Sequence, residues 1–178
     1  MKISKILSAV LAAIIAAALF AGCSKDTDTA VPDGMKLASD PAVAGYTLFV
    51  PDGWDVDMQT KSTRAYCPGS DKSFVMVMTG DLGSTSATVD EWWEEGLSEL
   101  EALYADFTLV SRGKTVLDGV EADKFVYTGT FDGTAFKYTQ TAAVKGGAIY
   151  VITYGAEADK WEAHSAEADS MLAAFRFN

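Results

Sequence analysis

The second half of the chain contains three two-residue pairs that favour tight reversals between extended segments. They are Asp118-Gly119, Asp132-Gly133 and Gly146-Gly147. Pairs of this kind adopt the positive φ angles that two-residue hairpin turns require. The pattern predicts four strands in an antiparallel meander over about residues 107–154, and it constrains the fold more than any other feature.

Two runs of the meander indicate how its faces are covered. "YVITYG", in the fourth strand, is apolar on both faces and predicts a central strand. In "FKYTQTAAV", in the third, Phe136 and Tyr138 share one face of the strand. Lys137, Thr139 and Thr141 share the other face. We expect that second face to be polar and in contact with water.

The segment before the meander predicts further strands. "YTLFVPDGWDVDM" has short alternating runs on either side of Pro51-Asp52-Gly53, and we expect a hairpin there. "RAYC" and "SFVMVMTG" follow as two strands joined by "PGSDK". The second is apolar on both faces, which predicts another central strand.

Two helices are predicted from apolar residues at helical spacing. The first covers "TVDEWWEEGLSELEALY", where Thr88 and Glu91 form a capping box at the start. The second covers about residues 156–173, and "FRFN" after it adds a short strand or packs on the domain. The expected fold class is therefore α+β, an antiparallel sheet of about six to seven strands with helices packed on it.

The N-terminus has the pattern of a secretory signal: Lys2 and Lys5 precede an apolar run that ends at Gly22. "FAGC", ending at Cys23, resembles the bacterial lipobox, in which small residues precede a cysteine that is lipid-modified. A plain cleaved signal and an uncleaved membrane anchor are the alternatives, since the run is near the lower length limit for a spanning helix. Cys23 is thus the predicted lipidation site and the contact with the membrane.

These features predict three parts of the chain. Residues 1–22 are expected to form the signal peptide, 23–44 a flexible tether rich in Ser, Asp, Thr, Pro and Gly, and 45–178 the folded domain.

Removal of the signal leaves 12 basic against 25 acidic residues, a net charge of −13 with the histidine neutral. This balance disfavours nucleic acid as a partner, because affinity for phosphates comes mainly from Lys and Arg. With Cys23 acylated, Cys67 is the one remaining thiol and no intramolecular disulfide can form. We interpret Cys67 as a small buried hydrophobe, with a reactive or intermolecular thiol as the alternative.

Few residues suggest chemistry. His164 is the single histidine, at the border of an apolar helical stripe, and no Cys or His lies near it in sequence to complete a metal site. Asp55 and Asp57 share one face of a strand and are read as solvated carboxylates. No phosphate-binding loop, dinucleotide fingerprint, EF-hand or nucleophile-elbow motif occurs, so no catalytic, cofactor or metal residues are predicted.

Trp92 and Trp93 point about 100° apart on the first helix, so both are fully buried only if the helix is widely covered. Trp92 lies at the edge of the apolar stripe. It is therefore the candidate contact residue for a partner.

The order of the segments resembles the PsbP-like superfamily, named for an extrinsic protein of the oxygen-evolving photosystem. The pieces that carry the resemblance are "VPDGW", the helix with paired tryptophans, "LDGVEADKFVYTG", "GTAFKYTQTAAVKGGAIYVITYGA" and "MLAAFRF". The resemblance covers about residues 45–178. It implies a sheet with helices on both sides and a mostly non-enzymatic role in stabilising or assembling partner complexes.

Together these observations predict a lipid-anchored, extracytoplasmic binding or accessory protein on the outer face of the cell membrane. Its partner is an unknown protein or small molecule. The alternatives are a protein of the same fold that handles calcium or manganese, as the resemblance implies for some members, and a surface hydrolase.

Overall fold

The structure is a computed structural model, and it describes residues 30–59 and 62–178. The predicted signal peptide and Cys23 lie outside these residues. The elements in chain order are β1 (Met35–Leu37), α1 (Pro41–Ala44), β2 (Tyr46–Thr47), β3 (Phe49–Pro51), β4 (Asp55–Gln59), β5 (Ser62–Tyr66), β6 (Phe74–Asp81), α2 (Val89–Leu103), β7 (Ala105–Leu117), β8 (Val120–Phe131), β9 (Thr134–Lys145), β10 (Ala148–Glu157), α3 (Trp161–Ala174) and β11 (Arg176–Phe177).

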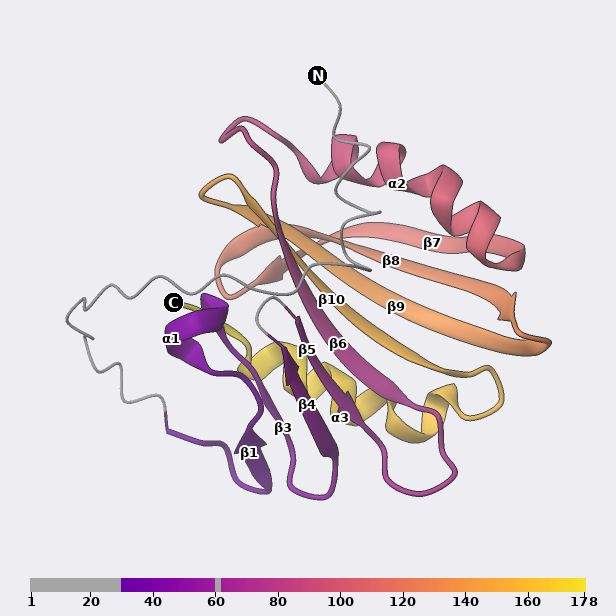
Figure 1. Cartoon of the computed structure of the whole chain (residues 1–178), viewed down its shortest axis with the longest axis horizontal. Helices are drawn as coiled ribbons and strands as arrows, with labels where there is room; N and C mark the ends of the chain where they lie inside the picture. The colour runs from indigo at the N-terminus through magenta and orange to yellow at the C-terminus, as the bar shows by residue number, and fades with distance from the viewer. Residues whose placement is uncertain (1–29, 60–61) are drawn as a thin grey trace.

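The main sheet has seven antiparallel strands in the order β4-β5-β6-β10-β9-β8-β7 (Figure 1). The predicted meander is confirmed as β7 to β10. Both residues of each turn pair have positive φ, for example 44° at Asp118 and 77° at Gly119. The turns therefore form where their local backbone preferences place them.

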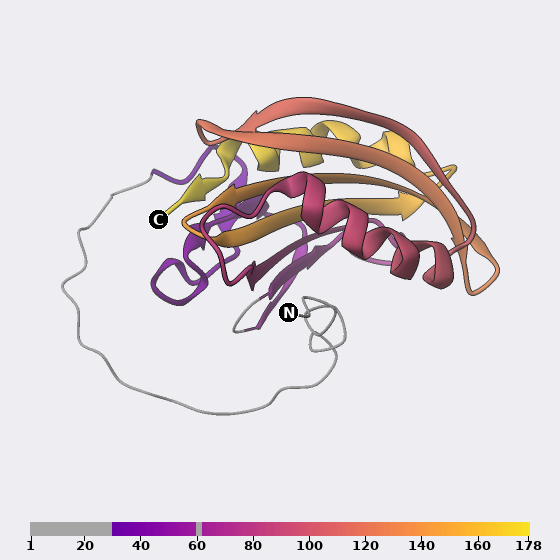
Figure 2. The same ribbon diagram turned by 90° about the horizontal axis from the view of Figure 1, so that it is seen from above.

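The two faces of the sheet are covered by different helices, as Figures 1 and 2 show. Trp93 of α2 packs with Phe125, Tyr138 and Val151 on one face. Met171 of α3 belongs to the core on the opposite face, which contains alternate sheet residues such as Val75, Val77, Ile152 and Tyr154. The predicted α+β fold with helices on both sides is confirmed, and β6 and β10 are central strands.

The capping box at the start of α2 is also confirmed. The Thr88 side chain accepts a hydrogen bond from the Glu91 backbone N–H at 3.2 Å, and the Thr88 N–H donates to Glu91 Oε2 at 2.9 Å. Among the residues that the structure describes, no helix has the length and apolarity to cross a membrane.

The domain begins earlier than residue 45. Met35–Leu37 pairs with β3, Ala38 is completely buried, and Ala38 N–H donates to the Leu48 carbonyl at 2.8 Å. The predicted tether is therefore too long at its C-terminal end. The polar composition of residues 23–44 gave no strand signal for Met35–Leu37, and this strand is stabilised by its pairing with β3.

The predicted hairpin around Pro51-Asp52-Gly53 is wrong. A turn does form, since Trp54 N–H donates to the Pro51 carbonyl at 3.0 Å. The strand before it, β3, pairs with β1 in a separate two-stranded sheet, whereas β4 pairs with β5 in the main sheet. The turn therefore connects two sheets, because β1 rather than β4 pairs with β3.

The expectation of a wet polar face on β9 is also wrong. Thr139 and Thr141 are 4% and 3% exposed. They lie beside Tyr154 and Ile152 of β10, on the face that carries α3. The ammonium group of Lys137 lies 3.6 Å from the ring centre of Trp161, at the start of that helix.

The C-terminus closes the domain. β11 pairs with β2, and Phe175 is fully buried against Tyr46, with ring centres 5.6 Å apart. The predicted second helix begins at Trp161, later than the expected start near residue 156, because β10 continues to Glu157.

Candidate functional site

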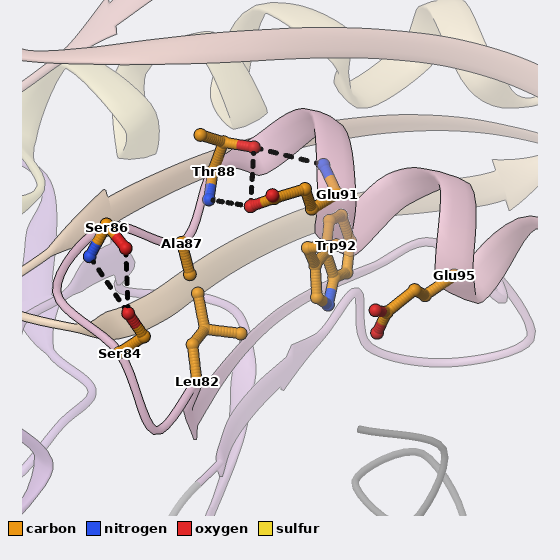
Figure 3. Close-up of a pocket in the computed structure, with 8 residues that line it drawn as sticks. All are labelled: Leu82, Ser84, Ser86, Ala87, Thr88, Glu91, Trp92 and Glu95. Atoms are coloured by element: carbon orange, nitrogen blue, oxygen red, sulfur yellow. Dashed lines mark hydrogen bonds between the residues drawn. The ribbon is translucent and has the colours of Figure 1, made fainter. Parts of the chain in front are cut away.

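The first candidate site is a pocket at the start of α2, shown in Figure 3, with a volume of about 240 Å³. Its lining residues come from the loop after β6 and the first turns of α2: Leu82, Ser84, Ser86, Ala87, Thr88, Glu91, Trp92 and Glu95. Trp92 is half-buried beside Trp93, with ring centres 6.4 Å apart. The structure therefore places the predicted contact residue in the wall of a surface pocket.

The pocket combines an apolar floor with polar edges. Leu82 is 6% exposed, and the Ser84 and Ser86 hydroxyls lie 2.9 Å apart. Glu91 is engaged in the capping box, whereas Glu95 is exposed one turn farther along α2. An indole between carboxylates favours a cationic or amphipathic group.

Ion pairs fix α2 to the sheet beside this pocket. Arg112 of β7 binds Asp90 of α2 and lies 3.3 Å from the buried carboxylate of Asp123, which Lys114 also approaches at 3.1 Å. Because Asp123 is 2% exposed, its charge needs these partners.

The second candidate site lies at the opposite helix, where Cys67, Asp71 and His164 meet. Cys67 Sγ is 3.2 Å from His164 Nε2, and Asp71 Oδ2 is 3.5 Å from the same nitrogen. One sulfur, one oxygen and one nitrogen from the three side chains all lie within 4.8 Å of one another. All three residues are partly exposed.

Neighbouring groups orient the histidine. His164 Nδ1 lies 2.5 Å from Glu167 Oε2 on the next turn of α3, and Trp54 packs at right angles to the imidazole with ring centres 5.6 Å apart. The loop that holds Cys67 and Asp71 is closed by two hydrogen bonds. Cys67 N–H donates to the Ser73 carbonyl at 2.9 Å, and Ser73 N–H donates to Asp71 Oδ1 at 2.7 Å.

The electrostatics of this cluster oppose an activated thiolate. Burial, with Asp71 and Glu167 nearby, raises the pKa of Cys67 above its ordinary value. Hydrogen bonding from Ser73 lowers the pKa of Asp71, which is therefore negative at neutral pH. A catalytic cysteine needs the opposite environment, one that stabilises the thiolate. Cys67, His164 and Glu167 are arranged like the nucleophile, base and orienting acid of a catalytic triad. The environment of Cys67, however, does not stabilise the thiolate that such a triad uses.

His164 lies at a partly exposed border of α3, as predicted, with 22% of its side chain accessible. The sequence did not predict that His164 meets Cys67, because the two residues are 97 positions apart. The one sequence feature that pointed to this site was the four-residue spacing of Cys67 and Asp71 in "CPGSD". Asp55 and Asp57 are both exposed on the edge strand β4, in agreement with solvated carboxylates.

Neither family models nor curated protein sequences gave a match to this chain. Comparison with solved structures did find similar proteins. Cyanobacterial PsbP from Synechocystis has a TM-score of 0.62 at 11% identity, over 89% of this chain and 98% of its own.

Two further solved structures are similar. LpqN, involved in cell envelope biogenesis of Mycobacterium tuberculosis, has a TM-score of 0.56 at 14% identity, over 81% and 90% of the two chains. PA94, a protein of unknown function from Pseudomonas aeruginosa, has a TM-score of 0.53 at 16% identity, over 76% and 92%. At these identities the likeness concerns the fold alone, and the chain has the PsbP-like fold that its sequence predicted.

Proposed function

We propose that this chain is a lipid-anchored, extracytoplasmic accessory protein that binds a protein partner through the pocket beside Trp92. The lipobox-like "FAGC" supports the placement, and similarity to LpqN, a protein of cell envelope biogenesis, agrees with it. Catalysis forms no part of the proposal.

The observation that carries the proposal is the half-buried indole of Trp92 in a pocket wall with Glu91 and Glu95. Tryptophan is enriched among residues that dominate binding energy, and it binds cations over its ring. The net charge of −13 expected after signal removal attracts basic partners over a longer range. We therefore infer a partner segment that inserts a Lys or Arg side chain into the pocket.

Crosslinking in intact cells tests this proposal. A photo-crosslinking amino acid at the exposed position of Thr85, beside the pocket, should give a discrete crosslinked product with one protein. Trp92→Ala should reduce the yield of that product, since loss of an aromatic anchor commonly costs about 2 kcal/mol of binding energy. Glu95→Lys should reduce it further through charge repulsion.

Asp159→Lys provides the matched control. It makes the same charge change in the turn before α3, away from the pocket, and should leave the crosslink unchanged. A crosslink that survives both pocket variants would contradict the proposed surface.

A further inference from the structure

We propose that Cys67, Asp71 and His164 form a binding site for a thiophilic divalent transition-metal ion such as Zn²⁺. The three donors come from two parts of the fold, the loop between β5 and β6 and the helix α3. Cys67 follows β5, Asp71 lies in the loop to β6, and His164 belongs to α3. The site lies beside α3, whereas the Trp92 pocket lies at α2 on the other face of the sheet, so this inference is independent of the proposed function.

The spacing of the donor atoms suits a tetrahedral ion. With ordinary zinc–sulfur, zinc–nitrogen and zinc–oxygen bond lengths, tetrahedral ligands lie about 3.4 to 3.6 Å from one another. Nε2 lies 3.2 Å from Sγ and 3.5 Å from Oδ2, and all three donors fall within 4.8 Å. The ion therefore requires only small side-chain shifts.

The hydrogen bond to Glu167 supplies the support that metal-binding histidines use. A carboxylate on one ring nitrogen holds the proton there and leaves the lone pair of the other nitrogen for the metal. Here Glu167 Oε2 lies 2.5 Å from Nδ1, and because a carboxylate accepts hydrogen bonds, this contact favours the tautomer with the proton on Nδ1. Nε2 faces Cys67 and Asp71. Trp54, at right angles to the ring, restricts its rotation. Glu167 thus acts as a positioning residue.

The donor types select the metal. Sulfur and imidazole nitrogen favour zinc, copper and related ions, whereas calcium and magnesium prefer sets of oxygen ligands. On binding, the thiol releases its proton to solvent and a metal–sulfur bond forms. A thiolate and a carboxylate then neutralise the two positive charges of the ion. Because the side chains are partly exposed, a fourth position remains for water or an external ligand.

Metal titration of the full chain tests the inference, with Cys23→Ala in the background so that Cys67 is its only cysteine. Metal-free protein should bind one Co²⁺ with thiolate-to-cobalt charge-transfer absorption, and Zn²⁺ should displace it at a one-to-one ratio. Ca²⁺ should not displace it.

Variants identify the ligands. Cys67→Ser should abolish the charge-transfer band, and His164→Ala should weaken zinc binding strongly. Glu167→Gln should retain the band but lower zinc affinity on the order of 10- to 100-fold, the usual effect of losing an orienting group. Glu162→Gln, an exposed residue on the same helix, is the control and should bind as the unaltered site does.

Two results would overturn the inference. One is zinc affinity that does not change in Cys67→Ser and Glu167→Gln, which would assign binding to other acidic groups. The other is rapid alkylation of Cys67 by iodoacetamide that saturating Zn²⁺ does not slow, which would indicate a free nucleophile. Circular dichroism of each variant separates loss of ligand from loss of fold.

Discussion

Gly155 in β10 lies where the packed sheet has no room for a side chain. A Cβ there would come within 2.7 Å of the Phe74 ring and 2.8 Å of the Tyr138 ring. These rings belong to the core under α2. Close packing of this kind tolerates almost no added volume, so the space around Gly155 fixes its identity.

We predict that Gly155→Ala lowers the free energy of unfolding by about 1–3 kcal/mol, the usual cost of overpacking a core. Urea denaturation measures it. Gly113→Ala in β7 is the control, because a Cβ there meets no atom within 4 Å. The explanation fails if both variants unfold at the same urea concentration.

At the scale of elements, α2 depends on local signals at its first turn. Thr88 and Glu91 satisfy each other's backbone N–H groups, and this turn also lines the Trp92 pocket. The same three-residue spacing allowed the helix start to be predicted from sequence. The shape of the pocket therefore depends on the cap.

Thr88→Ala should destabilise the protein by about 1 kcal/mol, because a backbone donor loses its partner. Thr88→Ser retains the hydroxyl and should unfold close to the original protein. Chemical denaturation compares the two, and amide exchange should show faster opening at the start of α2 in the alanine variant alone. Equal stability of the two variants would exclude the cap as a stabilising contact.

At the scale of the whole molecule, the lipid that we propose on Cys23 would hold the acidic domain at the membrane. Two or more acyl chains give stable membrane attachment, whereas one chain gives only marginal binding. The folded part has few basic residues to replace this attachment by binding anionic headgroups.

Cys23→Ala should therefore abolish incorporation of labelled palmitate and move the protein from the membrane pellet to the soluble fraction. Cys67→Ala removes the other cysteine and should keep both the label and the membrane association. A Cys23→Ala chain that still sediments with membranes would show that another segment provides the anchor.

Features that depend on neighbours in sequence were determined by the sequence itself. The turn pairs of the meander, the cap of α2 and the apolar faces of β6 and β10 follow from backbone preferences and periodicity within a few residues. Only the tertiary structure decided which strand β3 pairs with, that Thr139 and Thr141 are buried, and that Cys67 meets His164. Those outcomes depend on competition between distant segments for the same edge or face. Packing of the whole chain settles such competition, so its outcome cannot be predicted from local residue patterns.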